Sequence, residues 1–191
     1  MAANLIYVAN MSLDGYTEDK DGQFDWTEPG DEVFKFTTEI VQTTRTHLYG
    51  RRMYEVMRVW ETDPDLAAQS PLRRDFAETW QAADKIVYSR TLKTVSTRKT
   101  QLVKAFDPEA IRQLKTTSEH DILIGGPELA AHAFRAGLID ECQLFIVPIL
   151  LGGSKSALPG NVQLELKLLE ERCFGNGTVF LRYRTRQTIA S

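Results

Sequence analysis

Short apolar runs along the chain predict β-strands, and the segments between them have the three-to-four-residue spacing of amphipathic helices. The predicted strands cover residues 5–10, 47–49, 85–89, 101–103, 121–124 and 141–147. Two later segments alternate apolar and polar residues, the first at Leu164, Leu166 and Leu168, and the second at Val179, Leu181 and Tyr183. Gly175-Asn176-Gly177 between them predicts a hairpin turn of half-exposed strands.

Predicted helices begin at capping residues or prolines, namely at Asp31, Arg51, Ser70-Pro71, Asp107-Pro108 and Pro127. Asp31 is expected to act as the N-cap of a helix over residues 31–44. Residues 58–70 show no clear period. The polar segment 12–29 is a long loop, and ordered loops of this length usually carry function.

Strands that alternate with helices as far as Phe134, followed by a terminal hairpin, predict a three-layer α/β/α sandwich. The sheet should be mostly parallel, with an antiparallel C-terminal hairpin at one edge. No linker or repeat divides the 191 residues, so we expect a single domain over residues 1–187.

The charge balance limits the partners of the chain. With 23 Lys+Arg and 26 Asp+Glu, the formal net charge is -3, which gives no general attraction to nucleic acid or to an anionic membrane. No stretch reaches the roughly 20 apolar residues of a membrane span, and no basic leader precedes the first strand. We therefore expect a cytoplasmic protein that binds a small-molecule substrate.

Cysteine and histidine residues are too scattered to indicate a shared site. Cys142 and Cys173 are expected to be buried, inert thiols, with a disulfide or redox role as the alternative. His47, His120 and His132 form no i, i+4 pair and have no nearby ligand at metal-site spacing. We expect no metal site.

Gly125-Gly126-Pro127 joins a predicted strand to a predicted helix. Such a junction presents unpaired N–H groups and the positive end of the helix dipole at the carboxyl edge of the sheet. Glycine lets the backbone approach phosphate oxygens closely, so the junction can hold a pyrophosphate. The alternative is an ordinary turn that uses glycine for tight packing.

Gly50-Arg51-Arg52 repeats this geometry with two cations, and arginine offers a bidentate fork to phosphate. Ser89 and Arg90 follow another strand and can hold a 2′-phosphate, which favours NADPH over NADH. Each feature can instead be a solvated helix start or strand end. The G-x-G-x-x-G fingerprint is absent, and residues 152–156 lack the glycine spacing of a phosphate loop.

Three motifs carry a resemblance to a known family: NLIYVANMSLDGY at 4–16, LYGRRMYE at 48–55 and ILIGG at 122–126, with residues 144–153 after them. Together they resemble the dihydrofolate reductase superfamily. The nearest branch is the reductase domain of the bifunctional riboflavin-biosynthesis deaminase/reductase and its stand-alone bacterial relatives. The match runs in order along nearly the whole chain.

The resemblance implies a set of cofactor-binding residues, from the nicotinamide carboxamide at Ala9 to the phosphates and the adenosine. These residues are Ala9, Gly50, Arg51, Arg52, Ser89, Arg90, Gly125, Gly126, Pro127, Glu128 and Leu129. One departure is Met53, because the family often has threonine there, whose hydroxyl helps hold the pyrophosphate. Met53 could therefore weaken cofactor affinity.

On the substrate side, the resemblance implies a carboxylate at the start of the first long helix, where Asp31 and Glu32 lie. Asp31 is the candidate catalytic residue, although a carboxylate there is also an ordinary cap. Asn10, Ser12, Asp14 and Trp26 are expected to line the mouth of the substrate pocket. Asp14-Gly15 can equally be turn chemistry.

These features lead to an NADPH-dependent reductase that transfers hydride to a small heterocyclic substrate, pteridine- or pyrimidine-like and with or without a ribosylamino group. The alternative is a non-catalytic nucleotide-binding or regulatory protein on the same fold, favoured by Met53 and the missing clear proton donor. A folate enzyme proper is a third hypothesis, which predicts tight methotrexate binding. The apolar C-terminal strands and residues 144–151 suggest a homodimer.

Overall fold

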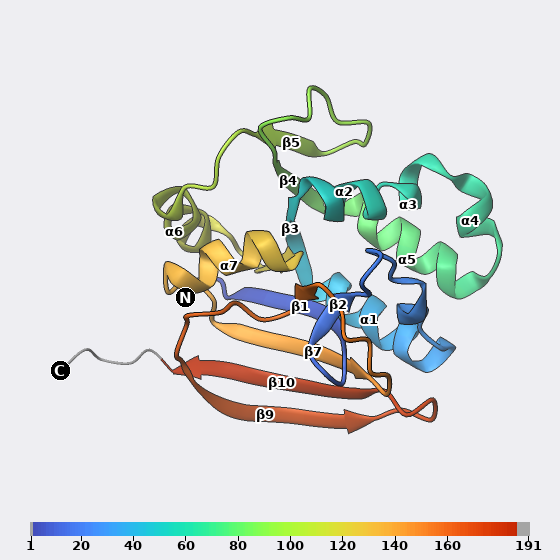
Figure 1. Cartoon of the computed structure of the whole chain (residues 1–191). Helices are drawn as coiled ribbons and strands as arrows, with labels where there is room; N and C mark the ends of the chain where they lie inside the picture. Colours follow the sequence, from blue (N-terminus) through green and yellow to red (C-terminus); the bar gives the residue numbers. More distant parts are fainter. Residues whose placement is uncertain (1, 187–191) are drawn as a thin grey trace.

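The computed structural model describes residues 2–186, which build one large sheet (Figure 1). Its strand order is β5-β4-β3-β6-β1-β7-β10-β9. The strands are β1 (Leu5–Ser12), β3 (Thr44–Gly50), β4 (Asp84–Tyr88), β5 (Thr100–Val103), β6 (Asp121–Gly125), β7 (Glu141–Val147), β9 (Glu165–Cys173) and β10 (Val179–Arg186). Neighbours from β5 to β7 run parallel, and β10 pairs antiparallel with β7 and β9. The predicted mostly parallel sheet with an antiparallel C-terminal hairpin is confirmed.

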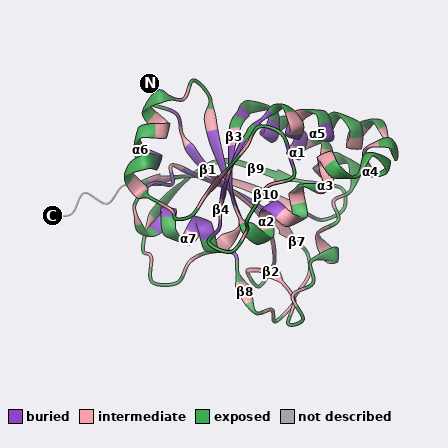
Figure 2. Cartoon of the chain, turned by 90° about the horizontal axis from the view of Figure 1, so that it is seen from above, coloured by how far each residue is buried: buried purple, intermediate pink, exposed green. Residues whose placement is uncertain are grey.

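Helices cover both faces of the sheet (Figure 2). One face carries α1 (Asp31–Thr43) and α5 (Pro71–Ala82), and the other carries α6 (Pro108–Thr117) and α7 (Pro127–Arg135). Three shorter helices, α2 (Arg51–Met57), α3 (Val59–Thr62) and α4 (Pro64–Ala68), connect β3 to α5. The predicted three-layer sandwich is confirmed, while the predicted domain end at residue 187 lies outside the described residues.

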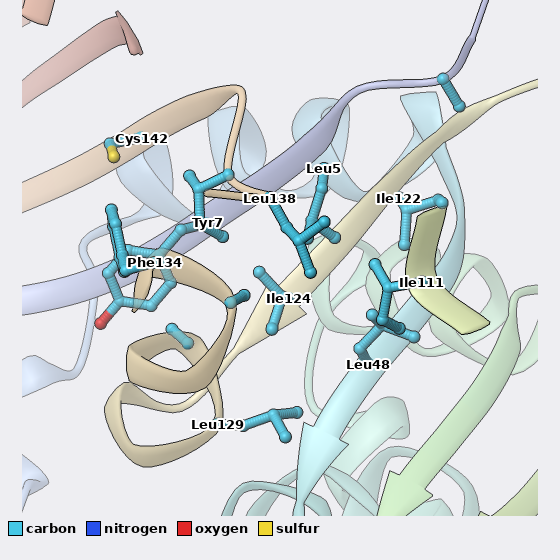
Figure 3. Close-up of a cluster of buried hydrophobic side chains, with 14 of the residues drawn as sticks. Leu5, Tyr7, Leu48, Ile111, Ile122, Ile124, Leu129, Phe134, Leu138 and Cys142 are labelled. Carbon is cyan, nitrogen blue, oxygen red and sulfur yellow. The ribbon is translucent and has the colours of Figure 1, made fainter. Parts of the chain in front are cut away.

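Each face of the sheet packs on its own core. Beneath α6 and α7, alternate residues of the central strands join Ile111 and Phe134 in a cluster of buried side chains (Figure 3). The opposite cluster contains Tyr49 and Trp80 and lies beneath α1 and α5. Successive strand residues point to opposite faces, which is why the central strands read as continuous apolar runs. Among residues 2–186, no helix has the length and apolar character that crossing a membrane requires.

One local prediction about helices was wrong. The N-cap of α1 is Gly30, and Asp31 is the first helical residue, with no side-chain capping bond at this end. Residues 58–70 contain α3 and α4, which are too short to display a helical period. By contrast, Ser70 and Asp107 cap their helices as predicted, by accepting from the N–H groups of Arg73 and Glu109.

The polar segment 12–29 is tied to a distant part of the chain. Its strand β2 (Tyr16–Glu18) pairs antiparallel with β8 (Lys155–Ser156). The contact is close enough that a β-carbon on Gly153 would overlap the Glu18 carbonyl oxygen. We call this two-stranded unit, residues 16–18 and 155–156, the flap.

The hairpin turn is confirmed by Gly177, which has a φ of +84°, and by a 2.9 Å bond from the Phe174 N–H to the Thr178 carbonyl. All nine residues of β9 are exposed, more than the half-exposed pattern predicted. Cys142 is buried, which raises the pKa of its thiol to about 12. The expectation of a second buried thiol was wrong, because Cys173 lies on the exposed edge strand.

Candidate active site

The strand registers bring the two glycine junctions to one edge of the sheet. Tyr49 pairs with Gly125, and Val8 pairs with Gly125 from the other side. The next residue along each strand is therefore Gly50, Gly126 or Ala9, and these three form a row. β6 ends at Gly125. On the side of β1 that pairs with β6, the residues from Ala9 onward therefore have no strand partner among the described residues.

Gly126 has a conformation that only glycine adopts readily. Its φ is +91°, and it is the N-cap of α7, with Pro127 at the first helical position. The first intrahelical bond runs from Ala130 N–H to the Gly126 carbonyl, so the N–H groups of Glu128 and Leu129 precede the helical ladder. These two donors, with the helix dipole behind them, form an anion-binding end.

The two junctions contact each other through side chains of α2 and α7. A β-carbon on Gly126 would lie 3.4 Å from Met53 Cβ, and one on Gly50 would lie 3.9 Å from Leu129 Cβ. Met53 therefore lies between the glycine pair and the arginines of α2. This is the position where the family resemblance implied a threonine hydroxyl.

A cleft of about 860 Å³ runs along this edge of the sheet. It is lined by all eleven residues predicted to bind cofactor and by the predicted pocket residue Asn10: Ala9, Asn10, Gly50, Arg51, Arg52, Ser89, Arg90, Gly125, Gly126, Pro127, Glu128 and Leu129. The structure thus brings together residues from four separate segments. Their assignment to a cofactor remains a prediction.

Ser12 and Asp14 do not line the cleft, although they were expected at its mouth. Ser12 is buried, and its hydroxyl donates to Asp14 (2.6 Å) while accepting from the Tyr16 N–H (2.9 Å). Asp14 also accepts from the N–H groups of Leu151 and Gly152. The hydrogen bond from Ser12, with those from the backbone, lowers the pKa of Asp14. Both residues therefore hold two loops together, which agrees with the alternative of a turn-forming role for Asp14.

Trp26 and Asp31 also lie outside the cleft lining. The Trp26 indole N–H donates to the Gln23 carbonyl within the same loop. Asp31 is exposed and lines a smaller adjoining pocket of about 190 Å³, together with Trp60, Ser70 and Arg73. The candidate catalytic carboxylate therefore does not line the cleft, although its pocket shares Glu28, Pro29 and Phe34 with it.

One end of the cleft carries residues that sequence reasoning missed. Lys104 and Phe106 follow β5, and His132 comes from α7. The Phe106 ring stacks near the His132 ring, with centroids 5.9 Å apart, and lies 5.7 Å from Tyr88. A signal existed for Lys104, because it follows a strand that the sequence predicted. An aromatic platform flanked by Arg90 and Lys104 suits a flat ring with an anionic substituent.

Four charged groups connect the flap to the two junctions. Glu18 Oε2 lies 3.0 Å from Arg52 Nη2, and Glu18 Oε1 lies 3.5 Å from Lys155 Nζ. Lys155 also pairs with Glu128 at 3.0 Å. The Glu18 side chain is only 12% exposed, so its charge is shielded from solvent beside the arginine. This four-residue ion network crosses the mouth of the cleft.

A buried polar chain supports the floor of the cleft. The Trp80 indole N–H donates to the Tyr49 hydroxyl (3.2 Å), which donates to His47 Nδ1 (3.2 Å). His47 Nε2 lies 3.1 Å from the Thr44 carbonyl, which can only accept, so Nε2 carries the proton of the neutral ring. Burial lowers the pKa of His47 to about 4. The Tyr49 ring packs beneath Gly125, where a β-carbon would approach it to 3.1 Å.

The other half of the cleft lies between α1 and β7. We define the distal half by its lining residues Asn10, Val33, Phe34, Thr37, Phe145, Asn176 and Thr178. Val33 and Phe145 are buried, and the polar members are neutral amides and hydroxyls. The cleft therefore has a cationic, glycine-rich half and a distal half that combines apolar side chains with uncharged polar ones.

The family model described as the RibD C-terminal domain matches residues 3–180. The chain is also 28% identical over 180 residues to the uncharacterized protein YyaP of Bacillus subtilis (strain 168), covering 91% of this chain and 90% of that protein.

Solved structures with the same fold include two related proteins. A candidate riboflavin biosynthesis protein from Shewanella sp. PV-4 superposes with a TM-score of 0.76 at 22% identity, over 98% of this chain and 100% of that chain. The diaminohydroxyphosphoribosylaminopyrimidine deaminase/5-amino-6-(5-phosphoribosylamino)uracil reductase of Thermotoga maritima gives 0.65 at 15% identity, over 97% of this chain and 57% of that chain. At these identities the likeness is one of fold.

Proposed function

Because the chain belongs to the RibD C-terminal domain family, we propose that it is an NADPH-dependent reductase acting on a small heterocyclic substrate. The observation that carries this proposal is the single cleft in which the two glycine junctions, their cations and the distal half meet. The name of the Thermotoga maritima neighbour includes a reductase of a substituted uracil, which is chemistry of this class.

The chain's residues fit a dinucleotide at the cationic half. The Gly126 backbone and the free N–H groups of Glu128 and Leu129 would hold the pyrophosphate, with Arg51 and Arg52 opposite. Ala9 would orient the nicotinamide amide through its backbone. Bound NADPH would supply hydride to a C=N or C=O bond in the distal half.

The preference for NADPH over NADH would come from Arg90 and Lys104, which flank the aromatic end of the cleft. The Ser89 hydroxyl accepts from the N–H groups of Leu92 (2.9 Å) and Thr91 (3.2 Å), so it holds the turn that carries Arg90. Its own proton can point to the Thr91 hydroxyl at 3.4 Å, and would turn from there to a 2′-phosphate oxygen.

The proton that completes the reduction would come from water. On this side Glu28 lines the cleft, but its side chain is exposed to solvent and paired with Arg73 at 3.1 Å, and Asp31 lies in the adjoining pocket. The chain's contribution would then be to position the two reactants and to exclude bulk water between apolar walls.

The test is a titration of the purified protein with NADPH and NADH, followed by an NADPH oxidation assay with pteridines and pyrimidines. We expect NADPH to bind at least tenfold tighter than NADH, and Arg90→Gln with Lys104→Gln to remove most of this difference, since each cation contacts a charged phosphate. No change in fluorescence or thermal stability with either nucleotide would refute the proposal.

Met53 favours a second candidate, a nucleotide-binding protein without catalysis, because its side chain lies against Gly126 where a hydroxyl is implied. Met53→Thr is expected to tighten NADPH binding by roughly threefold to tenfold, the value of one added hydrogen bond of ordinary strength. NADPH that binds but is never oxidised across the same substrates would support this candidate over the reductase.

We also propose that the chain forms a homodimer through β9. This edge strand pairs only with β10 among the described strands, and its Leu166, Leu168 and Leu169 are 43%, 44% and 37% exposed. Antiparallel pairing of two copies about Leu169 would set Lys167 opposite Glu171 of the second copy.

A further inference from the structure

Aromatic side chains form part of the walls of the distal half. Phe34, Trp60 and Phe76 pack with ring centroids 4.7 to 5.7 Å apart, and Phe34 and Phe76 line the cleft. Phe145 lies on the opposite side and is 1% exposed. A planar ring bound between these groups would bury apolar area on both faces.

The hydrogen-bonding groups around this space are neutral. The Thr37 hydroxyl donates to the Val33 carbonyl within α1, and the Asn176 side-chain oxygen accepts from the Thr178 N–H. The Asn176 amide NH₂, the Thr178 hydroxyl and the Asn10 amide can then pair with the edge of a heterocycle. They provide donors and acceptors without charge.

Carboxylates occupy the positions where a phosphate would be expected to bind on this side. The N-terminus of α1 is an anion-binding end by geometry, but Asp31 and Glu32 fill its first turn. Glu32 also accepts from the Gly175 N–H at 3.0 Å. The nearby Arg73 is paired with Glu28 at 3.1 Å, so its charge is already balanced.

The cations of the cleft lie away from the distal half. Among residues 2–186, the lysines and arginines that line it are Arg51, Arg52, Arg90, Lys104 and the flap residue Lys155. The first four belong to the cationic half, and Lys155 is held by two carboxylates. Residues 1 and 187–191 contain no cationic side chain.

We propose that the substrate of this chain is an uncharged planar heterocycle that carries no phosphate group. This inference rests on the proposed reductase function. It separates the chain from the Thermotoga maritima neighbour, whose name specifies a phosphoribosylamino substrate. A phosphate here would face Glu28, which lines the cleft and is paired with Arg73, and no lysine or arginine belongs to the distal half as defined above.

The experiment uses the NADPH-saturated protein and a matched pair of ligands, 5-amino-6-(5-phosphoribosylamino)uracil and the same compound after removal of its phosphate. Binding is followed by the fluorescence of Trp60, identified as the signal that Trp60→Phe removes. We expect the dephosphorylated compound to bind at least tenfold tighter. Equal or tighter binding of the phosphorylated compound, or no binding of the dephosphorylated one, would overturn the inference.

A charge variant tests the cause of the discrimination. Replacing Glu28 and Asp31 together by Gln and Asn removes two negative charges and frees Arg73, so the ratio between the two ligands should fall at least fivefold. Glu39→Gln, an exposed change on the same helix away from the cleft, should leave the ratio unchanged. An unchanged ratio in the double variant would contradict the electrostatic cause.

The two proposals fail in distinguishable ways. Failure of NADPH to bind in the titration described under the proposed function would refute the reductase. In that case the two ligands are titrated again without nucleotide. That second titration decides the substrate class alone, because a preference for the phosphorylated compound in either titration overturns it.

Discussion

Gly126 allows a test in which backbone strain and ligand binding are separated. Alanine at its φ of +91° should cost about 1 to 2 kcal/mol of folding free energy, because its β-carbon opposes the left-handed conformation. It should also weaken NADPH binding at least about tenfold, by holding the backbone away from the phosphate oxygens.

Gly137 provides the matched control. Its φ is +63°, a β-carbon there meets nothing within 4 Å, and it does not line the cleft. Gly137→Ala should lose similar stability in urea unfolding and leave NADPH affinity intact. Equal loss of affinity in both variants would show that strain, and not the approach to phosphate, governs binding.

The buried His47 predicts a pH dependence of stability. Burial places its pKa at about 4 in the folded chain, against 6.5 for an unperturbed histidine, so the unfolded state binds the proton more readily. The neutral ring therefore contributes fully to the free energy of unfolding above pH 6.5. This contribution, about 3 kcal/mol in total, is lost as the pH falls toward 4.

Urea unfolding at pH 7 and at pH 4.5 measures this effect. In His47→Gln, whose amide can also donate to the Thr44 carbonyl, the fall in stability should be smaller than in the wild type. His132→Gln changes an exposed ring and should behave like the wild type. The same fall in all three proteins would mean that other groups cause the acid sensitivity.

At the scale of elements, the ion network ties the flap to the site that we assign to the pyrophosphate. Glu18 competes with a phosphate for Arg52, since its carboxylate is 3.0 Å from that guanidinium and little exposed. Glu18→Gln should therefore lower the Kd for NADPH about fivefold at low salt, with a smaller gain at high salt.

Glu55→Gln is the control for this charge change, because Glu55 is solvent-exposed, pairs with Arg51 only at 3.8 Å and does not itself line the cleft. It should alter the Kd by less than about twofold, as expected for an exposed helix pair. Weaker NADPH binding in Glu18→Gln would instead mean that the carboxylate orients Arg52 productively.

The elements most easily predicted were those whose cause is local. Ser70 and Asp107 cap their helices through bonds two or three residues away, and each glycine junction combines a strand end with a helix start in adjacent residues. The four-residue α3 and five-residue α4 are too short to show a period. The exposure of β9 depends on its place at the edge of the sheet, which no local pattern records.

The site could be predicted only where its residues are adjacent along the chain. Ser12 and Asp14 have polar side chains suited to a pocket, but the loop that Asp14 binds lies 137 residues away. Glu18, Lys155 and Phe34 reach the cleft because β2 pairs with β8 and α1 packs on the sheet. Those long-range arrangements leave no signal in the surrounding sequence.

For the molecule as a whole, the proposed dimer can be tested at β9. Leu168→Glu places a charge among the exposed leucines and should convert a dimer to a monomer in size-exclusion chromatography with light scattering. Leu13→Glu is a control, because Leu13 is 64% exposed and lies outside both β9 and residues 144–151. A monomeric wild type at micromolar concentration would refute the proposed dimer.

The position of β1 in the sheet has a consequence for how the chain is made. Leu5 pairs with Ile122 and Ile6 pairs with Glu141, so β1 lies between two strands that are synthesised after it. Translation at about 5 to 20 residues per second leaves this apolar strand without partners for roughly 10 to 30 seconds. During that time the nascent chain exposes both edges of β1, so its yield in the cell should depend on chaperones that bind apolar segments.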